Sequence, residues 1–158
     1  MKGLLSLTAA LILLPLLTAC GPASAENPLP LQLGFYVAAD TPCANASNAT
    51  LLLLRADGIG GARDFCQFLS IRQLSAQDFL VTESCADFQA SEAEQRLVRY
   101  QIIDTVSFKL SRVTAEQPVL SQPSDTEVFY QGFYCPQSSL PEPWRDNDLS
   151  DLGINIKP

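Results

Sequence analysis

The clearest hydrophobic pattern in the chain is an alternation of apolar and polar residues within residues 97–103 and again within residues 106–113. A period of two places successive side chains on opposite faces of an extended strand. The apolar face carries Val98, Tyr100, Ile102, Val106, Phe108 and Leu110. The polar face carries Arg99, Gln101, Ser107, Lys109 and Ser111. We predict a half-buried antiparallel hairpin paired about Asp104, with Tyr100 opposite Phe108 and Ile102 opposite Val106.

A second hairpin is predicted from two apolar segments, residues 65–73 and 78–85, which flank a turn at residues 75–76. Pairing centred on that turn places Cys66 opposite Cys85. Directly opposed residues have Cβ atoms about 4.5–5.5 Å apart, which permits a disulfide bond. The same pairing predicts the contacts Leu69 with Thr82 and Ile71 with Leu80.

The four cysteines that follow residue 40 therefore predict two disulfides. The hairpin favours Cys66–Cys85, which leaves Cys43–Cys135 as the second bond. The pairing Cys43–Cys66 with Cys85–Cys135 stays open as the alternative. The long spacings and the absence of a Cys-x-x-Cys motif favour structural disulfides over a metal or redox site, so we assign no metal ligands.

Three further segments are rich in aromatic and branched residues and predict strands: residues 33–37, 50–55 and 127–134. The four consecutive leucines of the second segment indicate a strand covered on both faces. The glycine-rich residues 57–61 predict a turn, and Gly132 predicts a bulge in the last strand. Residues 86–95 predict either a short helix or a flexible loop.

These segments together predict an all-β fold, a small antiparallel barrel or sandwich of about seven strands with two disulfides. We place the β-domain at residues 33–136. Residues 114–125, which contain two prolines, predict a long loop within it. Residues 137–158 predict a tail rich in proline and aspartate that Trp144 packs onto the domain.

Residues 1–19 have a short basic start, an apolar core and an exit of small residues, which is typical of a secretory signal. The segment Leu17-Thr18-Ala19-Cys20 resembles the lipobox of bacterial lipoproteins, in which the cysteine is lipidated and becomes the new N-terminus. The resemblance covers the signal segment alone, and the mature domain resembles no characterised family that we can name. It implies a diacylglyceryl thioether on Cys20 and usually an amide-linked acyl chain.

The same resemblance implies a location. Gly21 after the cysteine is similar to the pattern of outer-membrane sorting, so we expect a lipid-anchored protein of the outer membrane that faces the periplasm. The proline-containing residues 20–32 predict a semi-extended tether. Cleavage after Ala25 by ordinary signal peptidase is the alternative, and it predicts a secreted or periplasmic protein.

The net charge of the chain restricts the classes of partner that we expect. Removal of residues 1–19 takes away Lys2 and leaves nine basic and seventeen acidic residues, a net charge of −8. No basic patch is visible, so nucleic acid binding is not expected. An acidic surface steers basic partners toward it, so a basic envelope or exogenous protein is the partner that the composition favours, besides the membrane that holds the lipid.

The chain contains no histidine, which excludes Ser-His-Asp and Cys-His catalysis. The remaining enzymatic routes are a carboxylate pair among Asp87, Glu92 and Glu94, or Lys109 with Ser107 or Ser111. Ordinary solvation explains these residues equally well. We therefore assign no catalytic residue and no cofactor.

Three aspartates in the tail, Asp146, Asp148 and Asp151, resemble part of a calcium loop. An EF-hand would place glycine where Asp151 stands and an acidic residue where Lys157 stands. We therefore interpret this segment as a surface tail.

Taken together, these features predict a non-catalytic binding or interaction module on the bacterial cell envelope. Its format, a small exported β-domain with disulfides, is shared with periplasmic lysozyme inhibitors, although their motifs are not evident here. The alternative is a small-ligand carrier with the barrel interior as its pocket. A histidine-free enzyme is the third class.

Overall fold

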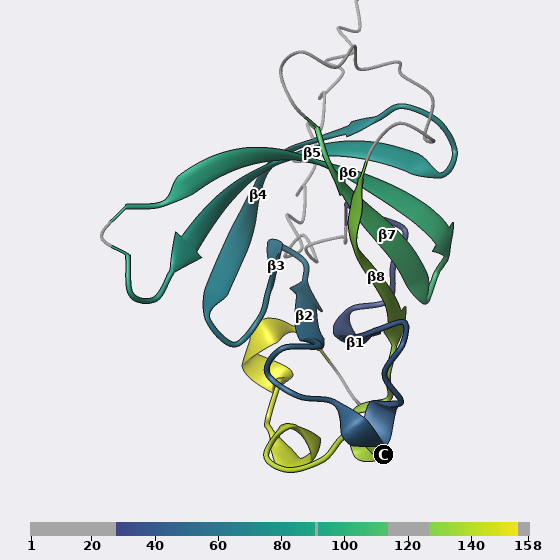
Figure 1. The fold of residues 1–158 in the computed structure, drawn as a ribbon, viewed down its shortest axis with the longest axis vertical. Helices are drawn as coiled ribbons and strands as arrows, with labels where there is room; N and C mark the ends of the chain where they lie inside the picture. Colours follow the sequence, from purple (N-terminus) through teal and green to yellow (C-terminus); the bar gives the residue numbers. More distant parts are fainter. Residues whose placement is uncertain (1–27, 91, 114–126, 155–158) are drawn as a thin grey trace, which may run out of the picture.

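Antiparallel pairing between neighbouring segments builds the whole sheet. The computed structural model describes residues 28–90, 92–113 and 127–154. Eight strands form a closed barrel in which each strand pairs with the next and β8 pairs with β1 (Figure 1). The strands are β1 (Gly34–Ala38), β2 (Leu51–Arg55), β3 (Gly58–Gly60), β4 (Asp64–Gln73), β5 (Asp78–Asp87), β6 (Glu94–Asp104), β7 (Ser107–Arg112) and β8 (Val128–Tyr134). The predicted all-β antiparallel fold is confirmed, in its barrel form.

The strand that the sequence did not predict is β3, which lies where a turn was expected. It is three residues long and pairs with β2 and β4 on either side. Its central residue, Ile59, is buried in the barrel, while a Cβ on Gly58 would lie 2.3 Å from the carbonyl oxygen of Cys66. The glycines therefore permit a close approach between β3 and β4. The prediction of a turn at residues 57–61 did not include this strand pairing.

Inward-facing side chains pack inside the barrel. The buried residues of this inner cluster include Tyr36, Tyr100 and Phe108, none of which exposes measurable surface. The rings of Tyr36 and Phe108 lie 4.9 Å apart, and those of Tyr100 and Phe108 lie 6.0 Å apart. An eight-stranded barrel has an interior that side chains of this size can fill.

The chain closes one end of the barrel before β1 begins. Leu29 and Leu31 are buried in the inner cluster, and the N–H of Gln32 donates to the carbonyl of Thr105 at 2.8 Å. The hydroxyl of Tyr36 donates to the carbonyl of Gln32 at 2.8 Å. The predicted tether of residues 20–32 is therefore wrong for its last residues, because the two leucines pack into the barrel. Residues 1–27, including Cys20, lie outside the described residues.

The β4–β5 hairpin pairs Cys66 with Cys85 as predicted, and the two residues form a disulfide. Nearer the turn the predicted register is wrong. A bulge between Phe68 and Ser70 offsets the pairing by one residue, so Ile71 lies opposite Val81 instead of Leu80. Likewise Ser70, and not Leu69, lies opposite Thr82. The extra residue of a bulge is left without a partner, which a count from the turn cannot anticipate.

The β6–β7 hairpin presents the predicted faces in a different register. Tyr100 lies opposite Leu110, and Ile102 lies opposite Phe108. The predicted register is wrong by two positions, and because two is the period of a strand, the buried face is unchanged. Val106 is the exception, since it lies in the turn and is 38% exposed.

The last strand is irregular at a different residue from the one predicted. The register between β7 and β8 shifts between Leu110 and Ser111, which leaves Phe129 unpaired, and Ser111 is buried although a polar exposed face was expected. Gly132 pairs regularly with Ala38 and Phe108. Its lack of a Cβ makes room for the ring of Tyr130, which would lie 2.6 Å away.

A second cluster of buried residues lies on the outer face of β1 and β2. Phe35 and Leu51 point outward there and pack with Leu140, Leu149 and Ile154. The C-terminal turns η3 (Gln137–Ser139), η4 (Trp144–Asp146) and η5 (Ser150–Leu152) carry this segment past β2 and β3 (Figure 1). Strand β2 is thus covered on both faces, which explains its run of leucines.

The second disulfide, Cys43–Cys135, joins η1 (Cys43–Asn45) to the end of β8. Both predicted pairings are therefore confirmed. For residues 86–95 the sequence predicts a short helix or a loop, and the described residues form no helix there: β5 continues to Asp87 and β6 begins at Glu94. Among the described residues, no helix has the length and apolar character needed to cross a membrane.

Candidate functional site

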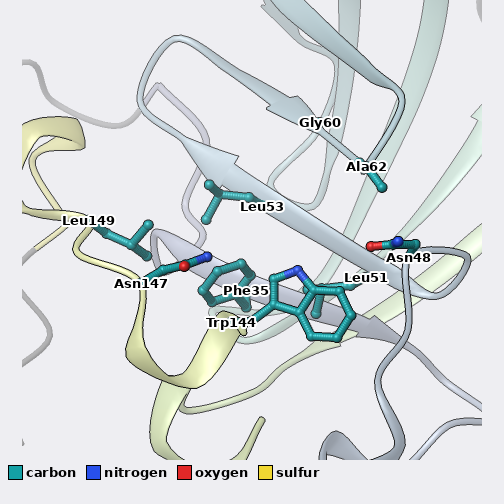
Figure 2. Close-up of a pocket in the computed structure, with 10 residues that line it drawn as sticks. Phe35, Asn48, Leu51, Leu53, Gly60, Ala62, Trp144, Asn147 and Leu149 are labelled. Atoms are coloured by element: carbon teal, nitrogen blue, oxygen red, sulfur yellow. The ribbon is translucent and has the colours of Figure 1, made fainter. Parts of the chain in front are cut away.

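A groove of about 370 Å³ lies on the outside of the barrel, between β1–β3 and the C-terminal segment. Figure 2 shows the indole ring of Trp144 next to Phe35, with Leu51 and Leu53 on the adjoining strand. Leu149 contributes a further apolar side chain from the same segment as Trp144. The groove therefore has an apolar floor that includes two aromatic rings.

A buried glutamine holds Trp144 at the groove. The side-chain Nε2 of Gln137 donates to the carbonyl of Trp144 at 2.7 Å and to the carbonyl of Asn147 at 2.6 Å. These two carbonyls stand at the two ends of the η4 turn. Gln137 is itself buried, so its amide holds the η4 turn from the protein interior. The indole of Trp144 is left on the side of the groove.

The opposite side of the groove is made of backbone. A Cβ on Gly60 would lie 2.8 Å from the carbonyl of Asp64, whereas one on Gly61 would meet Leu52 at 3.4 Å. Glycine at these two positions leaves peptide groups, with no side chain, at the groove wall. Asn48 and Asn147 add amide groups to the same groove.

The groove continues along β2 and β3 into a second hollow of about 370 Å³. Leu53, Gly60 and Gly61 line both spaces, and Phe65 and Phe88 extend the apolar surface. Phe88 is 71% exposed. Single exposed apolar residues are ordinary, but an aromatic ring at the end of an apolar groove indicates a contact surface.

The C-terminal segment that forms one side of the groove is acidic. Within residues 137–154 there are four acidic residues, Glu142, Asp146, Asp148 and Asp151, and one basic residue, Arg145. Arg145 contacts Glu142 and lies 3.7 Å from Asp146. Asp148 stands between the lining residues Asn147 and Leu149, and the backbone N–H of Ser150, at 3.0 Å, holds its pKa below the usual value. This carboxylate therefore stays charged at neutral pH.

A polar cluster lies inside the barrel, at the end opposite the buried leucines. Glu83 is 0% exposed and accepts hydrogen bonds from the hydroxyl of Tyr100 and from Nε of Arg96, the latter at 2.7 Å. Burial, and then the charge of Glu83, raise the pKa of Tyr100 well above its ordinary value. The carboxylate is also 3.8 Å from the sulfur of Cys85. A buried carboxylate of this kind is stable only because it is paired and hydrogen-bonded.

Sequence reasoning missed both the groove and Glu83. The signal for Glu83 is a charged residue in the inward sequence Phe79, Val81, Glu83 of β5, where the alternation predicts an apolar side chain. The signal for the groove is the single tryptophan of the chain among Leu140, Leu149 and Ile154.

The other residues that the sequence offers as catalytic or metal-binding candidates lie in different parts of the fold. The hydroxyl of Ser107 donates to Asp104, while Lys109 lies opposite Gln101 and Gln131 on outer positions of the sheet. Asp87 accepts the N–H of Gln89 at the end of β5. The ligand atoms of Cys66, Glu83 and Cys85 lie within 4.8 Å of one another, but the two sulfurs are bonded together and the carboxylate is paired with Arg96.

Comparisons of the chain with protein-family models, curated proteins and solved structures found no match. What distinguishes the outer groove is thus its own chemistry. It combines an apolar floor, a wall that includes two glycines, and a lining segment in which Asp148 stands between Asn147 and Leu149.

Proposed function

We propose that this protein is a lipid-anchored, non-catalytic binding module of the bacterial cell envelope, and that it holds a basic protein or peptide in the groove beside Trp144. The observation that supports the proposal most is the groove itself, a hollow of about 370 Å³ with an apolar, aromatic floor, to which an acidic C-terminal segment contributes Trp144, Asn147 and Leu149. Aromatic anchors in a desolvated pocket commonly dominate the binding energy of protein interfaces.

Charge supports a basic partner. The chain as a whole carries a net charge of −7, and residues 137–154 alone contribute −3, from four acidic residues and one basic residue. Negative groups around an apolar groove favour a ligand that places lysine or arginine beside an apolar side chain. The same charges increase the association rate of such a partner at low salt.

The anchor rests on Cys20 and the lipobox resemblance. Leu29, where the packed part of the chain begins, lies nine positions after Cys20, and a chain of that length spans at most about 30 Å. The barrel would thus remain near the membrane, on the periplasmic side of the outer membrane if the resemblance also holds for sorting. Substitution of Cys20 by alanine should release the protein from the membrane fraction, and mass spectrometry of the anchored form should find the acyl chains on residue 20.

Binding can be followed with the protein's own fluorescence, because Trp144 is the only tryptophan in the chain. The probe is a synthetic peptide in which phenylalanine and leucine alternate with lysine. We expect a saturable change in Trp144 emission on binding of the peptide. The affinity measured from it should fall by about tenfold when the salt concentration rises from about 50 to about 500 mM. A matched peptide with glutamate in place of lysine should leave the emission unchanged.

Two variants complete this experiment, with binding measured by calorimetry because one of them lacks the fluorophore. Trp144→Ala should abolish binding of the basic peptide, while Lys109→Ala, on the outer face of β7, should bind as the unaltered protein does. Equal binding of both peptides, or unchanged affinity in Trp144→Ala, would contradict the proposed groove function.

A further inference from the structure

The end of the barrel opposite Leu29 and Leu31 contains a space of about 160 Å³ that side chains do not fill. Residues from six strands surround it, so it lies within the mouth of the barrel and is separate from the floor of the outer groove. Each of β2, β3, β4, β6, β7 and β8 contributes at least one lining residue, among them Leu52, Ile59, Cys66, Arg96, Leu110 and Tyr130.

Arg96 brings a fixed cation to this space. Its Nε donates to Glu83, which is 0% exposed and is held in turn by the hydroxyl of Tyr100. Among the described residues, the two Nη groups of Arg96 have no hydrogen-bond partner, and 34% of the side chain is exposed. A guanidinium held by one nitrogen keeps N–H donors in a planar arrangement that suits a carboxylate.

Asp64 brings an anion to the same space. It lies at the start of β4, two residues before the inward-facing Cys66, and lines the mouth together with Arg96. The two opposite charges form no ion pair with each other in the described structure, so their charged atoms are more than 4 Å apart. Between them, the walls are aliphatic: Leu52, Ile59 and Leu110.

We propose that the barrel mouth binds a small apolar α-amino acid of about the size of valine or leucine. Its carboxylate would accept from the Nη groups of Arg96, its ammonium group would approach Asp64, and its side chain would contact the aliphatic walls. A zwitterion matches a site with one anion, Asp64, which forms no ion pair among the described residues, and one cation whose charge Glu83 partly compensates. A cavity of about 150 Å³ is known to hold a ligand of benzene size, which sets the upper limit for the side chain.

This site is independent of the proposed function of the groove, because a different set of side chains carries it. The side chains of the groove beside Trp144 come mainly from β1, β2 and the C-terminal segment, whereas those of the mouth come from inward-facing positions of β2 and of other strands. The two spaces share only Gly60 and Gly61, and Asp64 lines the mouth and the second hollow but not the groove beside Trp144. Either proposal can fail without the other.

The test is calorimetric titration of the full chain with L-leucine, 4-methylpentanoate and 3-methylbutylamine. The latter two lack the ammonium group and the carboxylate, respectively. We expect saturable binding of leucine and at least about tenfold weaker binding of each analogue, since each loses one charge-assisted contact. Absence of binding at leucine concentrations up to about 10 mM would overturn the proposal, because a Kd above that value is too weak for specific recognition. Equal binding of 4-methylpentanoate and leucine would overturn it as well.

Asp64→Asn provides the variant, because it leaves the Glu83–Arg96 pair intact. It should weaken leucine binding by about tenfold and leave the binding of 4-methylpentanoate unchanged, as expected for a contact with the ammonium group alone. Asp40→Asn, an exposed aspartate that lines none of the spaces described above, is the matched control and should bind leucine normally. An unchanged leucine affinity in Asp64→Asn would overturn the assignment. Circular dichroism of each variant confirms that it is folded before titration.

Discussion

Gln137 illustrates how one buried side chain shapes the groove. Its amide nitrogen serves two carbonyl groups, those of Trp144 and Asn147, and so determines where the indole lies. Leucine at this position has a similar volume but donates no hydrogen bond. In the Gln137→Leu variant the carbonyls of Trp144 and Asn147 therefore lose their hydrogen-bond donor, while the apolar residues around them remain.

We expect Gln137→Leu to lower the free energy of unfolding by about 1–3 kcal/mol, the usual cost of leaving buried polar groups unpaired. It should also shift the emission of Trp144 to longer wavelength, because the turn no longer holds the indole against Phe35. Urea unfolding and the fluorescence spectrum measure these effects. Ser139→Ala, which removes an exposed hydroxyl bonded to Pro136 in the same segment, should change both much less. Equal effects of the two substitutions would show that Gln137 does not position the turn.

Three tyrosines, Tyr36, Tyr100 and Tyr130, give the barrel a dependence on alkaline pH. Burial raises the pKa of each above the ordinary value of 10, and for Tyr100 the charge of Glu83 adds to the effect. In the unfolded chain these groups ionise near pH 10, while in the barrel they keep their protons. Their contribution to stability is therefore complete below pH 10 and is lost as the pH rises above it.

The unfolding free energy should thus fall as the pH rises from about 10 to about 12, with about 1.4 kcal/mol per pH unit from Tyr100 alone. Urea unfolding at several pH values gives this slope, and absorbance near 295 nm reports the tyrosinate. Tyr130→Phe should reduce the slope. Ionisation of all the tyrosines near pH 10 while the circular dichroism remains native would contradict the assigned burial.

The short strand β3 depends on the close approach of two backbones. The absence of a side chain at Gly58 lets β3 pair with β4 at a separation that a methyl group would prevent. Gly61 lies just beyond the same strand, but a Cβ there would meet its nearest neighbour at 3.4 Å. The two glycines therefore differ in how much the barrel depends on them.

We expect Gly58→Ala to destabilise the protein by about 1–3 kcal/mol, the range for overpacking, because the carbonyl of Cys66 cannot move without separating the strands. Gly61→Ala should have a smaller effect on the urea midpoint. A larger loss in Gly61→Ala than in Gly58→Ala would mean that the pairing of β3 with β4 is not what the glycines protect.

The strand faces could be predicted from the sequence because the side-chain period of a strand is two. Tyr100 and Phe108 were assigned to the buried face correctly even though the register was wrong, since a shift of two residues exchanges no faces. The turn length and the bulge near Leu69 are backbone features with no strong residue signature. The pairing of Cys66 with Cys85 is nevertheless predicted correctly. The observed register differs from the predicted one by one residue between the turn and the bulge, and beyond the bulge the two agree.

The groove could not be predicted, because it depends on a long-range arrangement. Trp144 and Leu149 reach Phe35 only after the chain has completed the barrel and returned past β2, with Cys43–Cys135 joining the two regions. The apolar residues of the tail indicated that it packs, but the strands it covers follow from the closure of the barrel. Glu83 was not recognised for a more local reason: its partner Arg96 lies opposite it on β6, and the pairing of β5 with β6 was not predicted.

The molecule as a whole has two differently constructed ends. The end near the N-terminal segment is closed by Leu29 and Leu31, while the other end carries Arg96, Asp64 and the connection that includes Phe88. A lipid on Cys20 would hold the closed end toward the membrane. The groove, which runs along β2 and β3, would then face the periplasm and its proteins.

Photo-crosslinking in intact bacterial cells that produce the full chain tests the groove function most directly. Benzoylphenylalanine replaces Asn48, an exposed residue of the groove, or in a control Lys109 on the outer face of β7. We predict that position 48 gives an adduct with a basic protein, and that this adduct disappears when Trp144→Ala is introduced in the same chain. Position 109 should give no such adduct. The same adduct from both positions, or its persistence in Trp144→Ala, would contradict the account of the groove as the binding site.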